Sequence, residues 1–145
     1  MTETAWSADD EDASASTMSD VECWEFLGQH EFGRLAFHLV GEVHITPLNY
    51  YLDDRELIFR TAEGSKFLAV HMKDDVAFEV DQIEGTSATS VVLRGTARTL
   101  EGDDARRAAD LPLRPWIGTS KHNIVAVSVN EISGRRFRLA EPHTA

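Results

Sequence analysis

Hydrophobic residues recur at helical spacing near the start of the chain and alternate with polar residues over most of the remainder. Val21, Trp24 and Leu27 are spaced for one face of a helix, which predicts a short amphipathic helix over residues 20–29, ended by Gly28. Ser19 or Asp20 can cap this helix, and Glu22 supports its first turn.

From Gly33 onward the alternation predicts short β-strands joined by turns. Six strands are expected, over residues 33–40, 43–52, 56–61, 76–83, 90–100 and 123–132. Residues 135–139 would continue the last strand after a turn at Gly134, and Gly95 is placed for a bulge in the fifth strand. Strands in hairpins with few helices predict an antiparallel barrel that is closed or nearly closed.

The segments between these strands contain turn-forming residues or further helical patterns. Gly41-Glu42 and Asp53-Asp54 are the expected hairpin turns. Residues 84–89 are small and polar, and residues 111–122 contain two prolines, so both are expected to be loops. Two more short helices are predicted over residues 65–73 and 103–110.

The charge of −11 is concentrated at the start of the chain of 145 residues. Residues 1–33 hold nine acids and no Lys or Arg, which leaves 16 acids and 14 bases in the remainder. We therefore expect a disordered acidic tail over residues 1–18 and one domain over residues 19–141. A basic stripe is missing, which argues against a nucleic-acid partner.

The sequence gives no sign of a membrane protein or of a familiar catalytic or metal motif. It has no long apolar run and no signal-peptide pattern, so we expect a cytoplasmic protein with no membrane partner. The single cysteine, Cys23, allows no internal disulfide and is expected to be structural. His38 and His44 are expected to face each other across the first hairpin, but a structural role is favoured over metal binding, and no metal site is predicted.

One segment combines the features of an anion site. A strand ends at Arg60-Thr61, and a helix is expected to start just after Gly64, where free backbone N–H groups favour a negative charge. The side chains that would surround a phosphate there are Arg60, Thr61, Ser65 and Lys66. A plainer interpretation stays open, in which Gly64-Ser65 only caps the helix and Arg60 pairs with Glu63.

The second unusual segment is Thr46-Pro47-Leu48-Asn49, within an expected strand. Proline cannot donate a ladder hydrogen bond, so the strand is at an edge or bulged there, and its backbone groups are open to a flat polar ligand. The alternative is an ordinary edge strand that Pro47 protects against aggregation.

Several short stretches, taken together, resemble the pyridoxamine 5′-phosphate oxidase-related, FMN-binding split-barrel family over about residues 20–140. The stretches are Gly33-Arg34-Leu35-Ala36, His44-Ile45-Thr46-Pro47-Leu48-Asn49-Tyr50, Ile58-Phe59-Arg60-Thr61, Gly64-Ser65-Lys66, Val76-Ala77-Phe78-Glu79-Val80-Asp81 and Val92-Leu93-Arg94-Gly95-Thr96-Ala97. The resemblance implies a mainly β fold with short helices, a six-stranded antiparallel split β-barrel of the flavin-binding type. It also implies a homodimer with two flavin sites at the subunit interface.

The resemblance assigns roles to residues at both segments described above. It implies that Arg60, Thr61, Ser65 and Lys66 hold the FMN phosphate, and that Pro47, Leu48 and Asn49 lie along the isoalloxazine ring. The partner subunit would complete the site with residues near Ser90 and Trp116. No catalytic side chain is implied, because the flavin carries out the hydride transfer.

The chain departs from the family pattern where close relatives read Gly-Trp-Ser-Val, since it has Ala88-Thr89-Ser90-Val91. An FMN-dependent oxidoreductase acting on a small molecule remains the leading hypothesis. A deazaflavin-dependent reductase is a second, for which a basic groove could come from Arg94, Arg98, Arg106, Arg107 and Arg114. A non-catalytic flavin-binding or heme-binding protein is the third.

Overall fold

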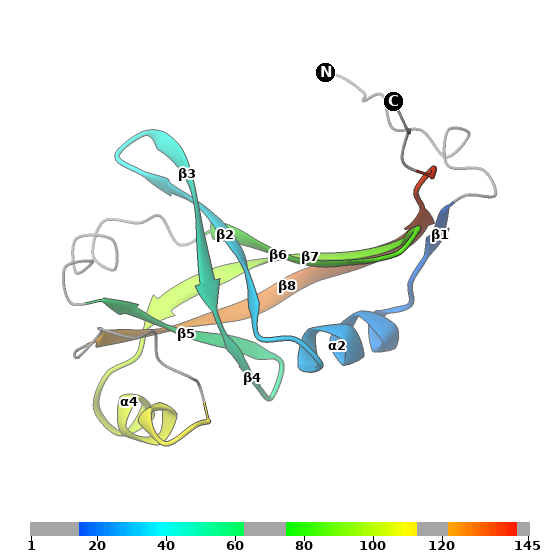
Figure 1. Cartoon of the computed structure of the whole chain (residues 1–145). Helices are drawn as coiled ribbons and strands as arrows, with labels where there is room; N and C mark the ends of the chain where they lie inside the picture. Colours follow the sequence, from blue (N-terminus) through cyan, green and yellow to red (C-terminus); the bar gives the residue numbers. More distant parts are fainter. Residues whose placement is uncertain (1–14, 63–74, 113–121, 142–145) are drawn as a thin grey trace.

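The computed structural model describes residues 15–62, 75–112 and 122–141. Eight strands form one antiparallel sheet in the order β3-β2-β6-β7-β8-β5-β4, with β1 paired to β8 outside this path (Figure 1). The strands are β1 (Ala15–Thr17), β2 (Phe32–Leu39), β3 (Glu42–Asn49), β4 (Tyr51–Asp53), β5 (Glu56–Ala62), β6 (Asp75–Glu84), β7 (Ser87–Thr99) and β8 (His122–Arg138). The helices are α2 (Asp20–Gly28) and α4 (Gly102–Ala109).

The mainly β, antiparallel fold with short helices is confirmed, with eight strands instead of six. Tyr50 interrupts the strand expected over residues 43–52 and separates β3 from β4. Residues 15–17, expected in the tail, form β1 on β8. The path of strands has β3 at one end and β4 at the other, so the described sheet is open, as in a split barrel.

The turns differ from the expected ones by one residue. Val40 and Gly41 both have positive φ, 51° and 81°, and so do Asp54 and Arg55, 51° and 67°. Two consecutive positive φ values are typical of the type I′ turns that match the twist of a hairpin. The expected loop over residues 84–89 is also shorter, because β7 already begins at Ser87.

The bulge predicted at Gly95 is present. Arg94 pairs with Glu131 but Gly95 pairs with Val129, so Asn130 is an extra residue on β8. The extra residue shifts the alternation of β8 and keeps Val127 and Val125 pointing into the core.

The turn predicted at Gly134 is wrong, since β8 runs without a break from His122 to Arg138. This glycine is required by packing: a Cβ added there would lie 2.7 Å from Cys23 Sγ and 2.8 Å from Met18 Sδ. The absent side chain lets the start of α2 lie directly against β8.

Helix α2 begins as expected and buries a different set of residues. Ser19 accepts a hydrogen bond from the Glu22 amide at 3.2 Å, and Glu22 Oε1 accepts one from the Ser19 amide at 2.9 Å, a reciprocal capping box. Cys23, Phe26 and Leu27 are buried, whereas Val21 is 64% exposed. Burial and the neighbouring acids raise the pKa of the Cys23 thiol, in line with a structural role.

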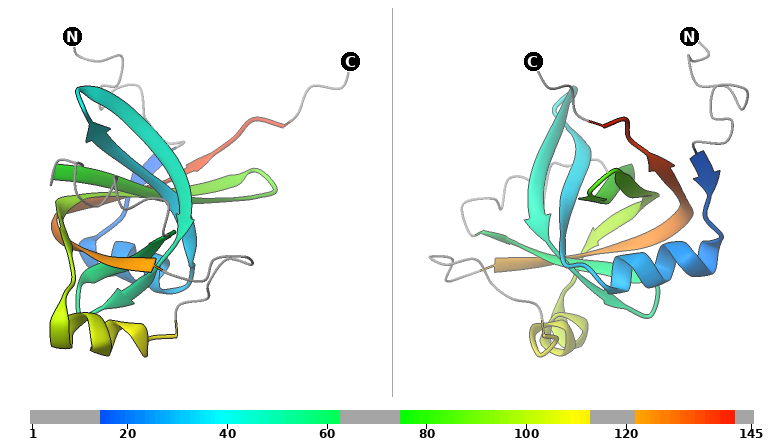
Figure 2. Two further views of the ribbon diagram at one scale, coloured as in Figure 1. Left: turned by 90° about the vertical axis from the view of Figure 1, so that its left-hand side faces the viewer. Right: turned by 45° about the vertical axis from the view of Figure 1, so that its right-hand side comes forward.

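The core fills the concave side of the sheet, and α4 covers a separate patch on the other side (Figure 2). Tyr50 anchors α2 to the core because its hydroxyl donates to the Leu27 carbonyl at 2.6 Å. Between α4 and the sheet, Ile58 and Ala126 form a small second cluster with Ala108. The helix expected over residues 65–73, most of the loop over 111–122 and tail residues 1–14 lie outside the described residues. Neither described helix is long and apolar enough to span a bilayer.

Candidate functional site

The sheet presents a surface on the side away from the core, called here the outer face. Residues paired across neighbouring antiparallel strands point to the same side, so the pairing defines rows across β3, β2, β6 and β7. One row on the outer face contains Pro47, Arg34, Glu79 and Val92. The adjacent row contains Phe32 and Asn49 on β2 and β3, and Asp81 and Ser90 on β6 and β7.

The expectation of an edge strand at Pro47 is confirmed, because β3 ends the path of strands. Pro47 pairs with Arg34 of β2, and the missing amide hydrogen does not interrupt an interior ladder. Leu48 points inward to the core, with 9% of its surface exposed, so it can address a ligand on the outer face only through its backbone.

The sheet divides beside these residues. β4 pairs with β5 through Tyr51 and Ile58, and extending this register would place Asn49 opposite Arg60. Asn49 instead pairs with Phe32 of β2, so β3 turns away from β5 at Tyr50. Residues 47–49 and 60–61 therefore flank the place where the barrel is split.

Arg60 contains the clearest unsatisfied donor at this place. Its Nη2 donates to the Ala109 carbonyl at 3.2 Å, at the end of α4. Its Nε is buried and has no hydrogen-bond partner within the described ranges. A buried donor costs free energy unless it is paired, which suits an acceptor bound at this point.

The remaining residues of the predicted phosphate site are only partly described. The backbone of Thr61 pairs with Asn123 of β8, which continues β5 past Arg60. Ser65, Lys66 and Trp116 lie outside the described residues. Their predicted roles stay predictions.

Ser90 belongs to a polar network that sequence reasoning missed. Its hydroxyl donates to Glu79 Oε2 at 3.2 Å, while Arg34 donates to Glu79 Oε1 from Nε at 2.9 Å and from Nη2 at 2.5 Å. The same Nη2 reaches Asp81 Oδ2 at 2.8 Å. We call Arg34, Glu79 and Asp81 the carboxylate cluster. A signal was present in the sequence, since two acids two residues apart share one face of a strand.

Burial raises the pKa of Glu79, and the nearby Asp81 adds to this effect, while Arg34 opposes it. The pKa of Arg34 is raised in turn, chiefly by its hydrogen bond to Glu79. The cluster thus consists of two acids that one guanidinium holds together on a half-buried part of the outer face.

Pro47 and Asn49 lie far from Ser90 within one chain. Strands β2 and β6 separate β3 from β7. Three strand spacings of about 4.8 Å make a separation of roughly 14 Å across a flat sheet. Within one chain, Pro47 and Ser90 therefore lie on separate parts of the outer face.

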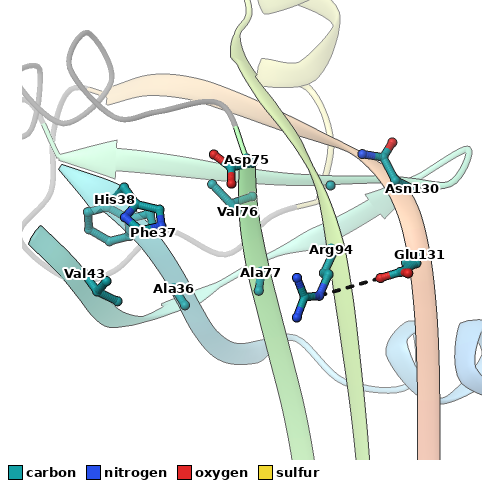
Figure 3. A pocket seen from close by; sticks show the side chains of 11 residues that line it. Ala36, Phe37, His38, Val43, Asp75, Val76, Ala77, Arg94, Asn130 and Glu131 are labelled. Carbon is teal, nitrogen blue, oxygen red and sulfur yellow. Dashed lines mark ion pairs between the residues drawn. The ribbon is translucent and has the colours of Figure 1, made fainter. Parts of the chain in front are cut away.

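A pocket of about 390 Å³ opens on the outer face (Figure 3). Ala36 and Ala77 form part of its floor, and Arg94, whose Nε lies 3.6 Å from Glu131 Oε1, stands at one side. A second pocket, of about 370 Å³, lies between α2 and β4 and includes His30 and Tyr51. None of the predicted site residues that the structure describes lines either pocket.

The expected opposition of His38 and His44 is wrong. His44 pairs with Phe37, with ring centroids 5.5 Å apart, and His38 pairs with Val43, so the two imidazoles point to opposite faces. Among the residues that the structure describes, no group of three or more His, Cys, Asp or Glu side chains could hold a metal ion.

Comparisons with known proteins agree with this architecture. Residues 19–136 match the family model described as pyridoxamine 5′-phosphate oxidase. A candidate pyridoxamine 5′-phosphate oxidase from Corynebacterium glutamicum is 36% identical, with a TM-score of 0.81, over 90% of this chain and 98% of that one. An FAD-binding protein from Mycobacterium smegmatis is also 36% identical, with a TM-score of 0.76, over 86% of this chain and 100% of that one. The uncharacterized protein Rv3129 of Mycobacterium tuberculosis is 40% identical over 58% of this chain and 77% of its own length.

The chain belongs to the pyridoxamine 5′-phosphate oxidase family, and its fold is that family's split barrel. The family resemblance in the sequence is thereby confirmed. Its relatives include flavin-binding proteins.

Proposed function

We propose that this protein is a flavin-dependent oxidoreductase that binds FMN at the subunit interface of a homodimer and acts on a small molecule. Family membership and an FAD-binding relative at 36% identity support a flavin. The observation that carries the proposal is the buried Nε of Arg60, which has no partner within the described ranges and lies at the split of the barrel.

The described residues fit a flavin. The orphaned Arg60 donor suits a phosphate oxygen, because a guanidinium forms strong charge-assisted hydrogen bonds with phosphate. The proposed phosphate site adds Thr61, Ser65 and Lys66, which follow Arg60 in the chain. On the other side of the split, β3 is at the edge of the described sheet, and the proposal places Pro47, Leu48 and Asn49 of this edge along the flat ring.

The flavin supplies the redox chemistry when it is bound, accepting or donating a hydride at its ring. The chain's own residues bind and orient it. Arg60 would hold the phosphate end, and the β3 edge would hold the ring. Orientation of this kind lowers the barrier by holding the reacting atoms at contact distance.

The outer face supports the proposed dimer. It exposes large apolar side chains from four neighbouring strands, among them Phe32, Val43, Ile45, Ile83 and Val92. Several exposed apolar residues gathered on one face are typical of protein–protein interfaces. A second copy on this face would also bring its Ser90 to the Pro47 side of the first, across the 14 Å or so that one sheet cannot span.

The pairing of the surface arginines favours FMN over deazaflavin. Four of the five arginines considered for a basic groove each have an acid beside them that reduces the local positive charge: Glu131 beside Arg94, Glu56 beside Arg98, Asp103 beside Arg106 and Asp104 beside Arg107. The fifth, Arg114, lies outside the described residues. A groove for a long acidic tail would need these cations to be available.

The proposal is tested by titrating the purified full-length protein separately with FMN, FAD, deazaflavin coenzyme and hemin, following absorption and fluorescence. We expect saturable FMN binding at one per subunit. Arg60→Ala should weaken FMN binding by at least about tenfold, the range for a lost charge-assisted hydrogen bond. Arg107→Ala is the matched control, because this arginine is 75% exposed and pairs only with Asp104 within the described residues.

Equal FMN affinity in the Arg60→Ala variant and the wild type would contradict the phosphate assignment. Binding of FAD or deazaflavin in place of FMN would contradict the assignment of FMN as the cofactor but would still support a flavin site. Binding of hemin alone would replace the oxidoreductase with a heme-binding protein.

A further inference from the structure

The hydroxyl of Ser90 has only one hydrogen to donate, and the carboxylate cluster takes it. Ser90 Oγ donates to Glu79 Oε2 at 3.2 Å. An ionised carboxylate accepts hydrogen bonds and cannot donate one, so the hydroxyl hydrogen must point to Glu79. The oxygen of Ser90 is then left with lone pairs for any ligand on the outer face.

The hydrogen bonds of Glu79 keep its carboxylate in place as the acceptor for the Ser90 hydroxyl. Two donations from Arg34 hold its Oε1, and this leaves Oε2 toward Ser90. The charged groups that act on Glu79 are Arg34 on β2 and Asp81 on its own strand. The salt bridges from Arg34 to Glu79 and Asp81 connect β2 to β6, so the carboxylate cannot rotate freely.

We propose that the carboxylate cluster fixes Ser90 as a hydrogen-bond acceptor, and so makes the outer face selective for a ligand ring that presents an N–H group. Glu79 is a positioning residue in this scheme, and Ser90 contacts the ligand. The inference rests on the proposed flavin site and goes beyond it by naming the ring atom recognised. On a flavin, the group that meets this requirement is N3–H, because the oxidised ring has no other N–H.

The test compares FMN with N3-methyl-FMN, which has the same phosphate and ring but no hydrogen on N3. Dissociation constants are measured by quenching of flavin fluorescence for the wild type, Ser90→Ala, Ser90→Thr and Glu79→Gln. The wild type should prefer FMN by about five- to tenfold, the value of one hydrogen bond. Ser90→Thr keeps the hydroxyl and should retain the preference.

Ser90→Ala and Glu79→Gln should bind the two flavins with nearly equal affinity. The glutamine amide can donate to Ser90, which lets the hydroxyl turn toward the ligand. Ser133→Ala is the matched control, since Ser133 pairs with Val92 on the same face and lies outside the network. Thermal unfolding of each variant shows that the fold is intact.

The outcomes separate the inference from the function on which it rests. If the wild type binds both flavins equally, or Ser90→Ala keeps the preference for FMN, the inference is overturned and the flavin site stands. If neither flavin binds to the wild type, the proposed function has failed and the inference with it.

Discussion

At Gly134, the start of helix α2 packs directly against strand β8. Its missing side chain leaves room for the sulfur atoms of Cys23 and Met18, each less than 3 Å from where a Cβ would be. Both residues are almost fully buried, at 0% and 4% exposure, so neither can move aside without disturbing the core. The position therefore requires glycine for packing, whereas its backbone conformation is ordinary extended strand.

We expect Gly134→Ala to lower the free energy of unfolding by about 1–3 kcal/mol, the usual cost of overpacking a core. Urea unfolding followed by tryptophan fluorescence measures this. Gly28→Ala is the control, because nothing lies within 4 Å of a Cβ added there. Equal loss in the two variants would show that the close approach of Cys23 is not what constrains the site.

The structural role of a single residue was predictable where neighbouring residues in the sequence determine it, and not where a contact distant in the sequence determines it. A helix cap at Ser19 or Asp20 and a bulge at Gly95 follow from local residue chemistry, and the structure confirms the cap at Ser19 and the bulge. The role of Gly134 depends on a helix more than a hundred positions away, so local residue patterns alone predict a turn there. The network around Ser90 needs the pairing of β2, β6 and β7, which the sequence does not reveal.

At the scale of elements, β5, β8 and β7 are joined by a polar network on the outer side of the sheet. Arg98 of β7 donates to Glu56 of β5 at 2.6 Å, and Ser128 of β8, which lies between them, donates to Glu56 at 2.8 Å. These hydrogen bonds lower the pKa of Glu56, with Arg98 making the largest contribution. A lowered carboxyl pKa stabilises the fold at pH values above the unfolded pKa.

We expect Glu56→Gln to reduce the free energy of unfolding by about 0.5–1 kcal/mol at pH 7, allowing for the partial exposure of the pair. The difference should disappear as the pH falls through 4.5 and below, where the wild-type carboxylate takes up its proton. Urea unfolding at several pH values measures the difference.

Glu131→Gln is the matched control, because Glu131 pairs with Arg94 on the same face with both side chains 74% exposed. It should change stability by no more than a few tenths of a kcal/mol. A Glu56→Gln difference that stays constant down to pH 3 would show that the charge of Glu56 is not the cause.

The elements themselves were largely predictable, and their boundaries less so. The alternation located all the sequence from β2 to β8 in six expected strands, and residue patterns placed both described helices, because these are local signals. The division of one expected strand into β3 and β4 was missed, since it depends on Tyr50 leaving the ladder to bind α2. The two hairpin turns lie one residue away from the expected positions. Val40 and Asp54 have positive φ in these turns, although neither is a glycine, because the strand pairing fixes the turn position.

At the scale of the whole molecule, the outer face of a single chain leaves large apolar side chains exposed to solvent. Ile45 and Val43 on β3 are 69% and 73% exposed. The proposed dimer would cover them, and removing apolar surface of this kind from water drives association.

We expect Ile45→Glu to convert the protein to monomers and to weaken FMN binding, since the site would lose the partner's Ser90. Light scattering after size exclusion measures the mass. Val21→Glu is the control, because Val21 on α2 is 64% exposed but lies away from the outer face. A dimer that persists in Ile45→Glu would exclude this face as the interface.

The continuous strand β8 has a consequence for how the protein opens. It pairs along its length with β1, β7 and β5, so strands from both sides of the split are hydrogen-bonded to the same seventeen residues. Splitting the barrel between β3 and β5 therefore creates no boundary along which half of the sheet could open alone. In amide hydrogen exchange, β8 should belong to the slowest group, and β5 and β7 should exchange together, as one cooperative unit of unfolding.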